Sequence, residues 1–531
     1  MKRQSSFRSL RFGTVLGALS ISVESVAFAQ APPTPPPTEA PPPAAPPPAA
    51  AAAPPPAAVA PAPAPMPMPA PAPAVAPATP EAPAPTEAPA APFAFGDFTW
   101  LNGGDRRHKN LLDTDLVSPI FLADTNYTYS FNRPIDDTVI GSTSLFRNNE
   151  IALLDMGLGA EFHGTHMRGK LLLQFGGRST VIPRNDGSNL KGQYSLATAY
   201  RYISEAYAGY HVDALSGYNI DAGLFMSYIG LYSYFSCENW SYQPSFTSDN
   251  TPWFFNGIRQ QIYFSDKYKF EPWIINGWQS YAKFNEMPGI GGSSLWMPVE
   301  EFKWVANTYI GWDESNNPGI FRFHEDDSIL VRYFNDQSKG TFLSKAAFSL
   351  TGDFGFETGD GVTPFGGKGH EGDCTTATPC SQNFLSWMLY NRFWFGEDHF
   401  GLTLGGGMMH NDGRYLVLPP GGFAAPGTPG TGFDTNFGTH FNGADFSVST
   451  QWMPDDYVEF LAEFVHRQTD TPYYNGHGGI SGPTGYNNPP VDNPNAGGSI
   501  GAGSPTGVGA GWTPDLVKSE NRLIFAILAR M

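Results

Sequence analysis

The sequence predicts an all-β protein: a transmembrane antiparallel β-barrel of about 16 strands, preceded by a signal peptide and a disordered Pro/Ala-rich tether. Three observations predict this class. Apolar and polar residues alternate along many segments, and short and long connections alternate between those segments. The chain also ends on such a segment, NRLIFAILARM at 521–531, where every odd-numbered position from 523 onward is apolar. An apolar face that runs to the last residue suits hydrocarbon better than water.

Residues 1–29 have the pattern of a secretory signal peptide. Lys2, Arg3, Arg8 and Arg11 precede an apolar run, and Ala27-Phe28-Ala29 forms an A-x-A cleavage site. The alternative is a membrane anchor. The apolar run is short for that role, and Glu24 interrupts it.

Residues 30–92 consist almost entirely of Pro and Ala. Such a segment has nothing to bury, so we expect a disordered, extended periplasmic tether. At roughly 3.1 Å per residue it could reach on the order of 190 Å. Residues 93–118 follow as a periplasmic or plug segment, in which Phe98, Trp100 and Leu101 favour packing at the mouth of the lumen over an extension of the tether.

Residues 119–531 form the predicted outer-membrane barrel. The short connections all fall at one end and the long ones at the other, as in outer-membrane barrels, where the short turns are periplasmic. An odd strand count would break this parity, while fourteen or eighteen strands remain open. The sixteen strands are expected at 119–131, 148–162, 165–176, 199–212, 217–228, 252–265, 268–280, 288–297, 300–312, 328–336, 341–355, 383–397, 398–409, 443–453, 455–468 and 519–531.

Each strand presents one apolar and one polar face. In DYVEFLAEFVHR, Phe460 and Phe464 alternate with Glu459 and Glu463. In EIALLDMGLGAEF the same rule sends Ala152, Leu154, Met156, Leu158, Ala160 and Phe162 to lipid. The alternative is a soluble β-sandwich, but its strands would be shorter and its long loops would not gather at one end.

Strand parity assigns charged residues of both signs to the lumen, where a barrel of this size would hold a water-filled channel. Taken singly, each could equally be a solvated wall residue. The predicted pore-lining residues are Arg168, Lys170, Arg201, Glu205, Arg259, Lys303, Arg332, Lys345, Arg392, Glu459 and Glu463.

The long loops carry more acid than base. A negative vestibule attracts cations over roughly a Debye length, about 8–10 Å, so we expect weak cation preference at low salt. Inward cations such as Arg168, Lys170, Arg259 and Arg392 would reverse it if the loops stood clear of the pore. The loop acids are Asp136, Asp137, Glu238, Asp249, Asp313, Glu314, Glu325, Asp326, Asp327, Glu357, Asp360, Glu371, Asp373, Asp412, Asp434, Asp470 and Asp492.

No enzyme or cofactor motif occurs, so we expect no catalysis, no cofactor and no metal. Cys374 and Cys380, in CTTATPC, could form a disulfide in an exported chain. GKGHEGDC at 367–374 could hold a metal, but solvated loop polarity is the simpler interpretation. The net charge of −18 argues against nucleic acid as a partner.

Several stretches resemble the family of OmpL-like β-barrel porins. Among them are NYTYSFNRP at 126–134, YRYISEAYAGYHVD at 200–213, DAGLFMSYIGLYSY at 221–234, ENWSYQPSFTSDNTPWFFNGIR at 238–259 and EPWIINGWQSY at 271–281. The resemblance implies a bacterial outer-membrane channel and brings no catalytic or binding residue. Members typically end on an aromatic residue. This chain ends on Met531, so recognition by the barrel assembly machinery would rest on Phe525 and Ile527.

The expected function is passive diffusion of small hydrophilic solutes or ions across an outer membrane. Two alternatives remain open: a structural envelope protein tethered to peptidoglycan or a periplasmic partner, and a surface receptor or adhesin built from loops 410–442 and 469–518. The expected partners are outer-membrane lipid, the barrel assembly machinery and further copies of the chain as a homo-oligomer.

Overall fold

The structure of the protein is a computed structural model. It describes residues 91–134, 137–142, 144–183, 186–188, 193–314, 317–338, 340–370, 373–413, 415–416, 440–477 and 516–531. The predicted signal peptide and nearly all of the predicted tether lie outside the described residues.

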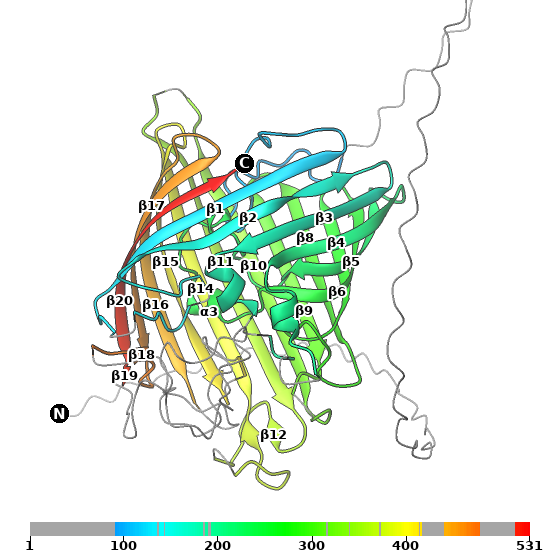
Figure 1. Cartoon of the computed structure of the whole chain (residues 1–531), viewed down its shortest axis with the longest axis vertical. Coiled ribbons are helices and arrows are strands. Elements are labelled where there is room, and N and C mark those ends of the chain that lie inside the picture. The colour runs from blue at the N-terminus through cyan, green and yellow to red at the C-terminus, as the bar shows by residue number, and fades with distance from the viewer. Residues whose placement is uncertain are drawn as a thin grey trace, which may run out of the picture. The chain divides into compact units, whose positions relative to one another are not determined.

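Sixteen antiparallel strands form one closed barrel, each hydrogen-bonded to its neighbours in sequence order (Figure 1). Closure pairs the last strand with the first, from Leu122 opposite Arg530 to Ser130 opposite Arg522, which leaves no sheet edge unpaired. The strands are β1 (Val117–Ser130), β2 (Ile151–His163), β3 (Met167–Phe175), β4 (Ile203–Val212), β5 (Tyr218–Met226), β6 (Phe254–Ser265), β7 (Tyr268–Ile275), β8 (Gly289–Val299), β9 (Phe302–Gly311), β10 (Phe321–Asn335), β11 (Leu343–Thr358), β14 (Asn383–Phe395), β15 (Phe400–Asp412), β16 (Asn442–Trp452), β17 (Val458–Thr469) and β20 (Ser519–Arg530).

The predicted barrel class and strand number are confirmed. The alternation of β20 is also as expected: Phe525 and Ile527 are exposed on the outer wall, whereas Ile524 and Leu528 are buried inside. The short connections meet at one end of the barrel, the short-turn end, where the chain terminates. The long connections meet at the other, the long-loop end, where Figure 1 shows β12, β18 and β19.

Several strand boundaries differ from those expected: β4 begins at Ile203 rather than at 199, β7 ends at Ile275 rather than at 280, and the largest difference is at β10. β10 begins at Phe321 rather than at 328. The stretch FRFHEDD, residues 321–327, was expected in a long loop. In the structure it is strand, with Arg322, His324 and Asp326 buried inside.

One face assignment was also wrong. The register of β1 against β2 shifts between Asp124 and Thr125, so that Asp124 opposes Asp155 and Thr125 opposes Leu153. Leu154 is therefore the extra residue of a β-bulge, and the alternation changes phase there. Ala152 and Leu154, expected at lipid, are buried, while Leu153 is exposed.

The remaining described elements are small and lie in the long connections. They are α1 (Arg178–Val181), α2 (Leu196–Ala199), η2 (Ser236–Glu238), α3 (Phe246–Asp249) and the two-residue strands β12 (Val362–Thr363), β13 (Cys380–Ser381), β18 (Tyr474–Asn475) and β19 (Leu516–Val517). Cys374 and Cys380 form a disulfide with their Cα atoms 5.2 Å apart. Within the described residues, no helix is long and apolar enough to cross a membrane.

Candidate functional site

The connection between β5 and β6, residues 227–253, enters the barrel; we call it the inserted segment. Trp240, Tyr242 and Phe246 in its middle are almost completely buried. They pack against inward-facing residues of strands far away in the sequence, such as Trp394 of β14. The lumen therefore contains a side-chain core, and the water-filled cross-section expected from the strand number is reduced.

Four arginines donate to backbone carbonyls or uncharged side chains of the inserted segment, in addition to Arg530, which pairs with Glu238. Arg178 donates to the Tyr234 carbonyl and to Ser236 Oγ at 2.8 Å. Arg392 of β14 donates to the Trp240 carbonyl at 3.2 Å. A carbonyl in a water-poor lumen needs such a donor, because an unpaired buried polar group is costly. Arg467 and Arg522 complete the set.

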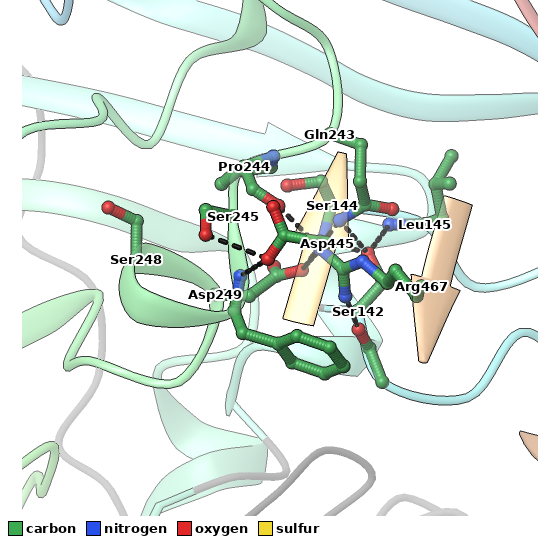
Figure 2. A network of polar contacts seen from close by, with 12 residues as sticks. Ser142, Ser144, Leu145, Gln243, Pro244, Ser245, Ser248, Asp249, Asp445 and Arg467 are labelled. Atoms are coloured by element: carbon green, nitrogen blue, oxygen red, sulfur yellow. Dashed lines mark hydrogen bonds and ion pairs between the residues drawn. The ribbon is translucent and has the colours of Figure 1, made fainter. Parts of the chain in front are cut away.

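Figure 2 shows the network around Arg467 of β17. Its guanidinium donates to the carbonyls of Gly141 and Pro244 and lies 2.8 Å from Asp249 Oδ2. Asp445 of β16 accepts from the Ser245 hydroxyl at 2.8 Å. A buried charge pair that makes several further hydrogen bonds to the segment favours one geometry for it.

Carboxylates of the wall cap the free backbone N–H groups of the same segment. Glu463 of β17 accepts from the backbone N–H of Tyr242 at 2.7 Å and from that of Gln243 at 3.0 Å. Asp124 of β1 accepts from the Tyr242 hydroxyl at 2.6 Å. Wall charges on β1, β16 and β17 thus hold a loop in place rather than facing open water.

A second segment, residues 93–108, occupies the short-turn end. Trp100 is buried, and its carbonyl accepts from Trp240 Nε1 at 3.1 Å. The Asn102 side-chain oxygen accepts from the Trp240 backbone N–H at 2.9 Å. This N-terminal segment and the inserted segment therefore form one packed unit inside the barrel.

Ion pairs attach the N-terminal segment to the barrel. Asp97 pairs with Arg332 and lies 3.7 Å from Lys345. Burial alone would raise the pKa of Asp97, but hydrogen bonds from Thr99 and the charge of Lys345 outweigh burial and lower that pKa. Asp105 behaves in the same way: Arg107 and Arg530 lower its pKa against the effect of burial. Both carboxyls are therefore ionised at neutral pH.

The wall formed by β2 to β7 is different, because its charges pair with each other and keep contact with solvent. Arg168 and Arg259 both contact Asp221, at 3.2 and 2.8 Å. The Asp221 side chain is 0% exposed, whereas that of Arg168 is 28% exposed. Lys170 lies 2.6 Å from Glu205 and 3.2 Å from Glu161.

One cavity opens beside these charges, and a second lies beside the N-terminal segment. The first, of about 280 Å³, is lined by Glu161, Arg168, Tyr207, His211 and Asn219, among others. The other, of about 500 Å³, lies at the short-turn end. It is lined by Asp97, Arg106, His108, Asn335, Gln337, Lys345, Trp394, Glu397, Asp398, His399, Met453, Asp455 and Asp456, with Thr99. Both are large enough to hold several waters.

The predicted pore-lining residues thus divide into two groups. Arg168, Lys170, Glu205 and Arg259 lie on the solvent-contacting wall, and Lys303 of β9 is partly exposed near it. Arg332, Lys345, Arg392, Glu459 and Glu463 contact the N-terminal or inserted segment, with Arg106 3.9 Å from Glu459.

Arg201 was placed in a strand and is not in one. β4 begins at Ile203, and Arg201 donates to the Thr180 hydroxyl at 2.9 Å, at the long-loop end. The sequence reasoning also missed the inserted segment. Its available signal was composition: Trp240, Tyr242, Phe246 and Trp253 are many large aromatics for an exposed loop.

Five acids assigned to the outer vestibule are buried or held in ion pairs instead. Glu238 pairs with Arg530, and Asp249 pairs with Arg467. Asp313 and Glu357 both contact Arg322, at 3.6 and 2.7 Å, and Asp326 is fully buried in β10. The argument for a negative vestibule therefore rests on fewer residues than expected.

Comparison with solved structures finds other outer-membrane barrels at low identity. OprB of Pseudomonas putida aligns at 8% identity over 78% of this chain and 94% of its own, with a TM-score of 0.43. The channel DcaP of Acinetobacter baumannii aligns at 9% over 78% and 96%, with a TM-score of 0.41. An anion-selective porin from Comamonas acidovorans aligns at 8% over 78% and 99%, with a TM-score of 0.42. A search of curated sequences finds no significant match.

The family comparison is more specific. The model of the family described as "Putative beta-barrel porin-2, OmpL-like" matches residues 122–488, which run from within β1 to beyond β17 and include the charges of the β2–β7 wall. The family resemblance and the outer-membrane location predicted from the sequence are confirmed. The chain belongs to this OmpL-like β-barrel porin family and is a bacterial outer-membrane β-barrel.

Proposed function

We propose that the protein is a narrow porin that allows small hydrophilic solutes and ions to diffuse passively along the β2–β7 wall. The observation that carries this proposal is the pairing of Arg168 and Arg259 on one fully buried carboxylate, Asp221. The pairing satisfies the buried acid, and Arg168 also lines the smaller cavity. Such a wall offers hydrogen bonds to water and solutes without binding them tightly.

The inserted segment fills the β16–β17 side of the barrel, which favours a narrow path over a wide one. Inward residues of β16 and β17, such as Ser449 and Glu463, are buried behind the inserted segment. A sixteen-strand barrel with an open lumen would pass a wide aqueous column. Here the inserted segment removes much of that area, which favours small solutes.

Purified, folded full-length protein in planar lipid bilayers tests the proposal. We expect stepwise conductance increments that are small for a barrel of sixteen strands. A liposome-swelling assay with sugars of increasing size should show uptake that declines steeply with solute size. A bilayer that stays electrically silent while folded protein is inserted would overturn the proposal.

A further inference from the structure

A cluster of metal-binding side chains lies at the long-loop end, on the rim formed by β15, β16 and β17. It consists of His410 and Asp412 at the end of β15, His440 just before β16, and Asp470 just after β17; we call it the rim cluster. Among the described residues, the side chains of these four hydrogen-bond or pair with one another, with Asn442 and with Thr471. The cluster is therefore separate from the proposed solute path.

The distances within the rim cluster match a shared ion. One ligand atom from each of His410, Asp412 and His440 lies within 4.8 Å of the other two. His440 Nδ1 is 2.9 Å from Asp412 Oδ1, and His410 Nε2 is 3.9 Å from Asp412 Oδ2. Ligands at 2.0–2.2 Å from one tetrahedral ion stand about 3.3 Å apart, so only small side-chain shifts are needed.

Asp470 lies beside the other ring nitrogen of His440, where it can orient that ring as a carboxylate behind a metal-bound histidine does. Its Oδ2 lies 3.3 Å from His440 Nε2. The carboxylate is held by the Asn442 backbone N–H at 2.9 Å and the Asn442 side-chain amide at 2.7 Å. The nitrogen of His440 that faces Asp412 is Nδ1, so Nε2 remains for Asp470.

Asn442 also orients one of the histidines. Its side-chain oxygen is 2.7 Å from His410 Nδ1, so that nitrogen carries the proton and Nε2 keeps its lone pair. In metal sites the non-ligating nitrogen of a histidine almost always donates to such an acceptor, which fixes the ring. The lone pair of Nε2 is on the side of Asp412.

We propose that the rim cluster binds one divalent transition-metal ion of the zinc class through His410, Asp412 and His440, with Asp470 orienting His440 and water in the fourth position. Two imidazoles and one carboxylate suit Zn²⁺, whereas Ca²⁺ and Mg²⁺ prefer all-oxygen sites. The sequence reasoning looked for metal ligands in GKGHEGDC, but Cys374 there is joined to Cys380 and offers no thiolate.

The ion would join residues at which neighbouring long connections begin and end. His410 and Asp412 lead into the connection after β15, His440 closes it, and Asp470 opens the connection after β17. Binding at this rim stabilises the folded arrangement of the three strand ends by mass action. The site faces the medium outside the barrel, so free metal reaches it without passing through the lumen.

Titration of folded, untagged full-length protein with Zn²⁺ in detergent tests the proposal, using calorimetry and the visible absorption of Co²⁺ as a geometric readout. We expect one ion per chain and a tetrahedral Co²⁺ spectrum. His410→Gln and His440→Gln should each weaken binding at least tenfold. Asn442→Ala should weaken it about 10–100-fold by releasing His410.

His399→Gln is the matched control, because His399 is an exposed histidine in the β14–β15 turn at the opposite end of the barrel. It should bind Zn²⁺ as the unaltered protein does. β-sheet circular dichroism and heat-modifiable migration verify that each variant is folded. The proposal is overturned if the His410→Gln/His440→Gln double variant binds Zn²⁺ like the unaltered protein, or if His399→Gln weakens binding equally.

Discussion

Arg467 illustrates how single buried charges decide the architecture of the lumen. It joins β17 to both Gly141 and the inserted segment, and its partner Asp249 is fully buried. Arg467→Met leaves that carboxylate without its arginine. We expect a loss of about 3–5 kcal/mol in the free energy of unfolding, measured by denaturant titration in detergent.

Arg168→Met is the matched control for this prediction. Its partner Asp221 keeps Arg259 at 2.8 Å, and Arg168 is partly exposed. The loss of stability should therefore be clearly smaller than for Arg467→Met. Equal losses would contradict the assignment of Arg467 to anchoring and Arg168 to the solvent-contacting wall.

Glu325 and Asp327 of β10 are acids on the outer wall, near the middle of the strand. The Thr308 hydroxyl donates to Glu325 at 2.6 Å and Trp304 Nε1 donates to Asp327 at 3.2 Å. A carboxylate at lipid is costly. We expect Asp327→Asn to raise the free energy of unfolding in lipid vesicles by about 1 kcal/mol, while Glu397→Gln in the β14–β15 turn has no effect. A lower stability for Asp327→Asn would show that this face contacts protein rather than lipid.

Residue type and parity predicted which strand positions point inward, but not which inward charges meet water. Glu463 and Arg168 both obey the alternation of their strands. Only the position of residues 227–253 separates a capping carboxylate from a pore-wall cation. That information is carried by contacts between segments more than two hundred residues apart.

At the scale of elements, the N-terminal segment should respond to acid. The folded-state pKa values of Asp97 and Asp105 are lowered, so their ionised forms stabilise docking above the usual range near pH 4. That contribution is lost as the pH falls through the lowered folded values. A spin label at Phe98→Cys, with Cys237→Ala, should stay immobile from pH 8 to about 4.5 and become mobile only below that.

A label at Gln337→Cys, in the β10–β11 turn, controls for general acid effects on the barrel. It should show no transition over the same range. Mobilisation of the Phe98 label between pH 7 and 5 would contradict the ion pairs as the cause of docking.

Elements were predictable where periodicity was intact and unpredictable where it was interrupted. The regular alternation in β20 located both its faces. The bulge at Leu154 shifts the inward–outward alternation of β2 by one residue, and no residue type there indicates a bulge. The inserted segment has no period at all, so length alone assigned it to an outer loop.

At the scale of the whole molecule, exposed acids lie at the short-turn end of the barrel. At the short-turn end Glu300 and Glu301 are 41% and 50% exposed, while their partner Arg332 is 1% exposed. We therefore expect weak cation preference in a potassium chloride gradient at low salt, fading as screening increases. The double variant Glu300→Gln/Glu301→Gln should reduce it. Anion preference at low salt would show that the β2–β7 wall sets selectivity.

The number of strands and the closure of the barrel were predictable because the parity of connections constrains the whole chain at once. Every short connection had to fall at one end, and all sixteen segments satisfied that condition. The filling of the lumen was not predictable in this way. It depends on the tertiary contacts of one connection, and no rule based on local sequence predicts those contacts.

The central claim is that solutes follow the β2–β7 wall while the β16–β17 side is filled. Accessibility of single cysteines during bilayer recording tests it most directly. In a Cys237→Ala background, a small charged thiol reagent should change the current through His211→Cys, which lines the smaller cavity. It should leave Ser449→Cys, buried on β16, unaffected. Rapid modification of Ser449→Cys with no response from His211→Cys would contradict the account.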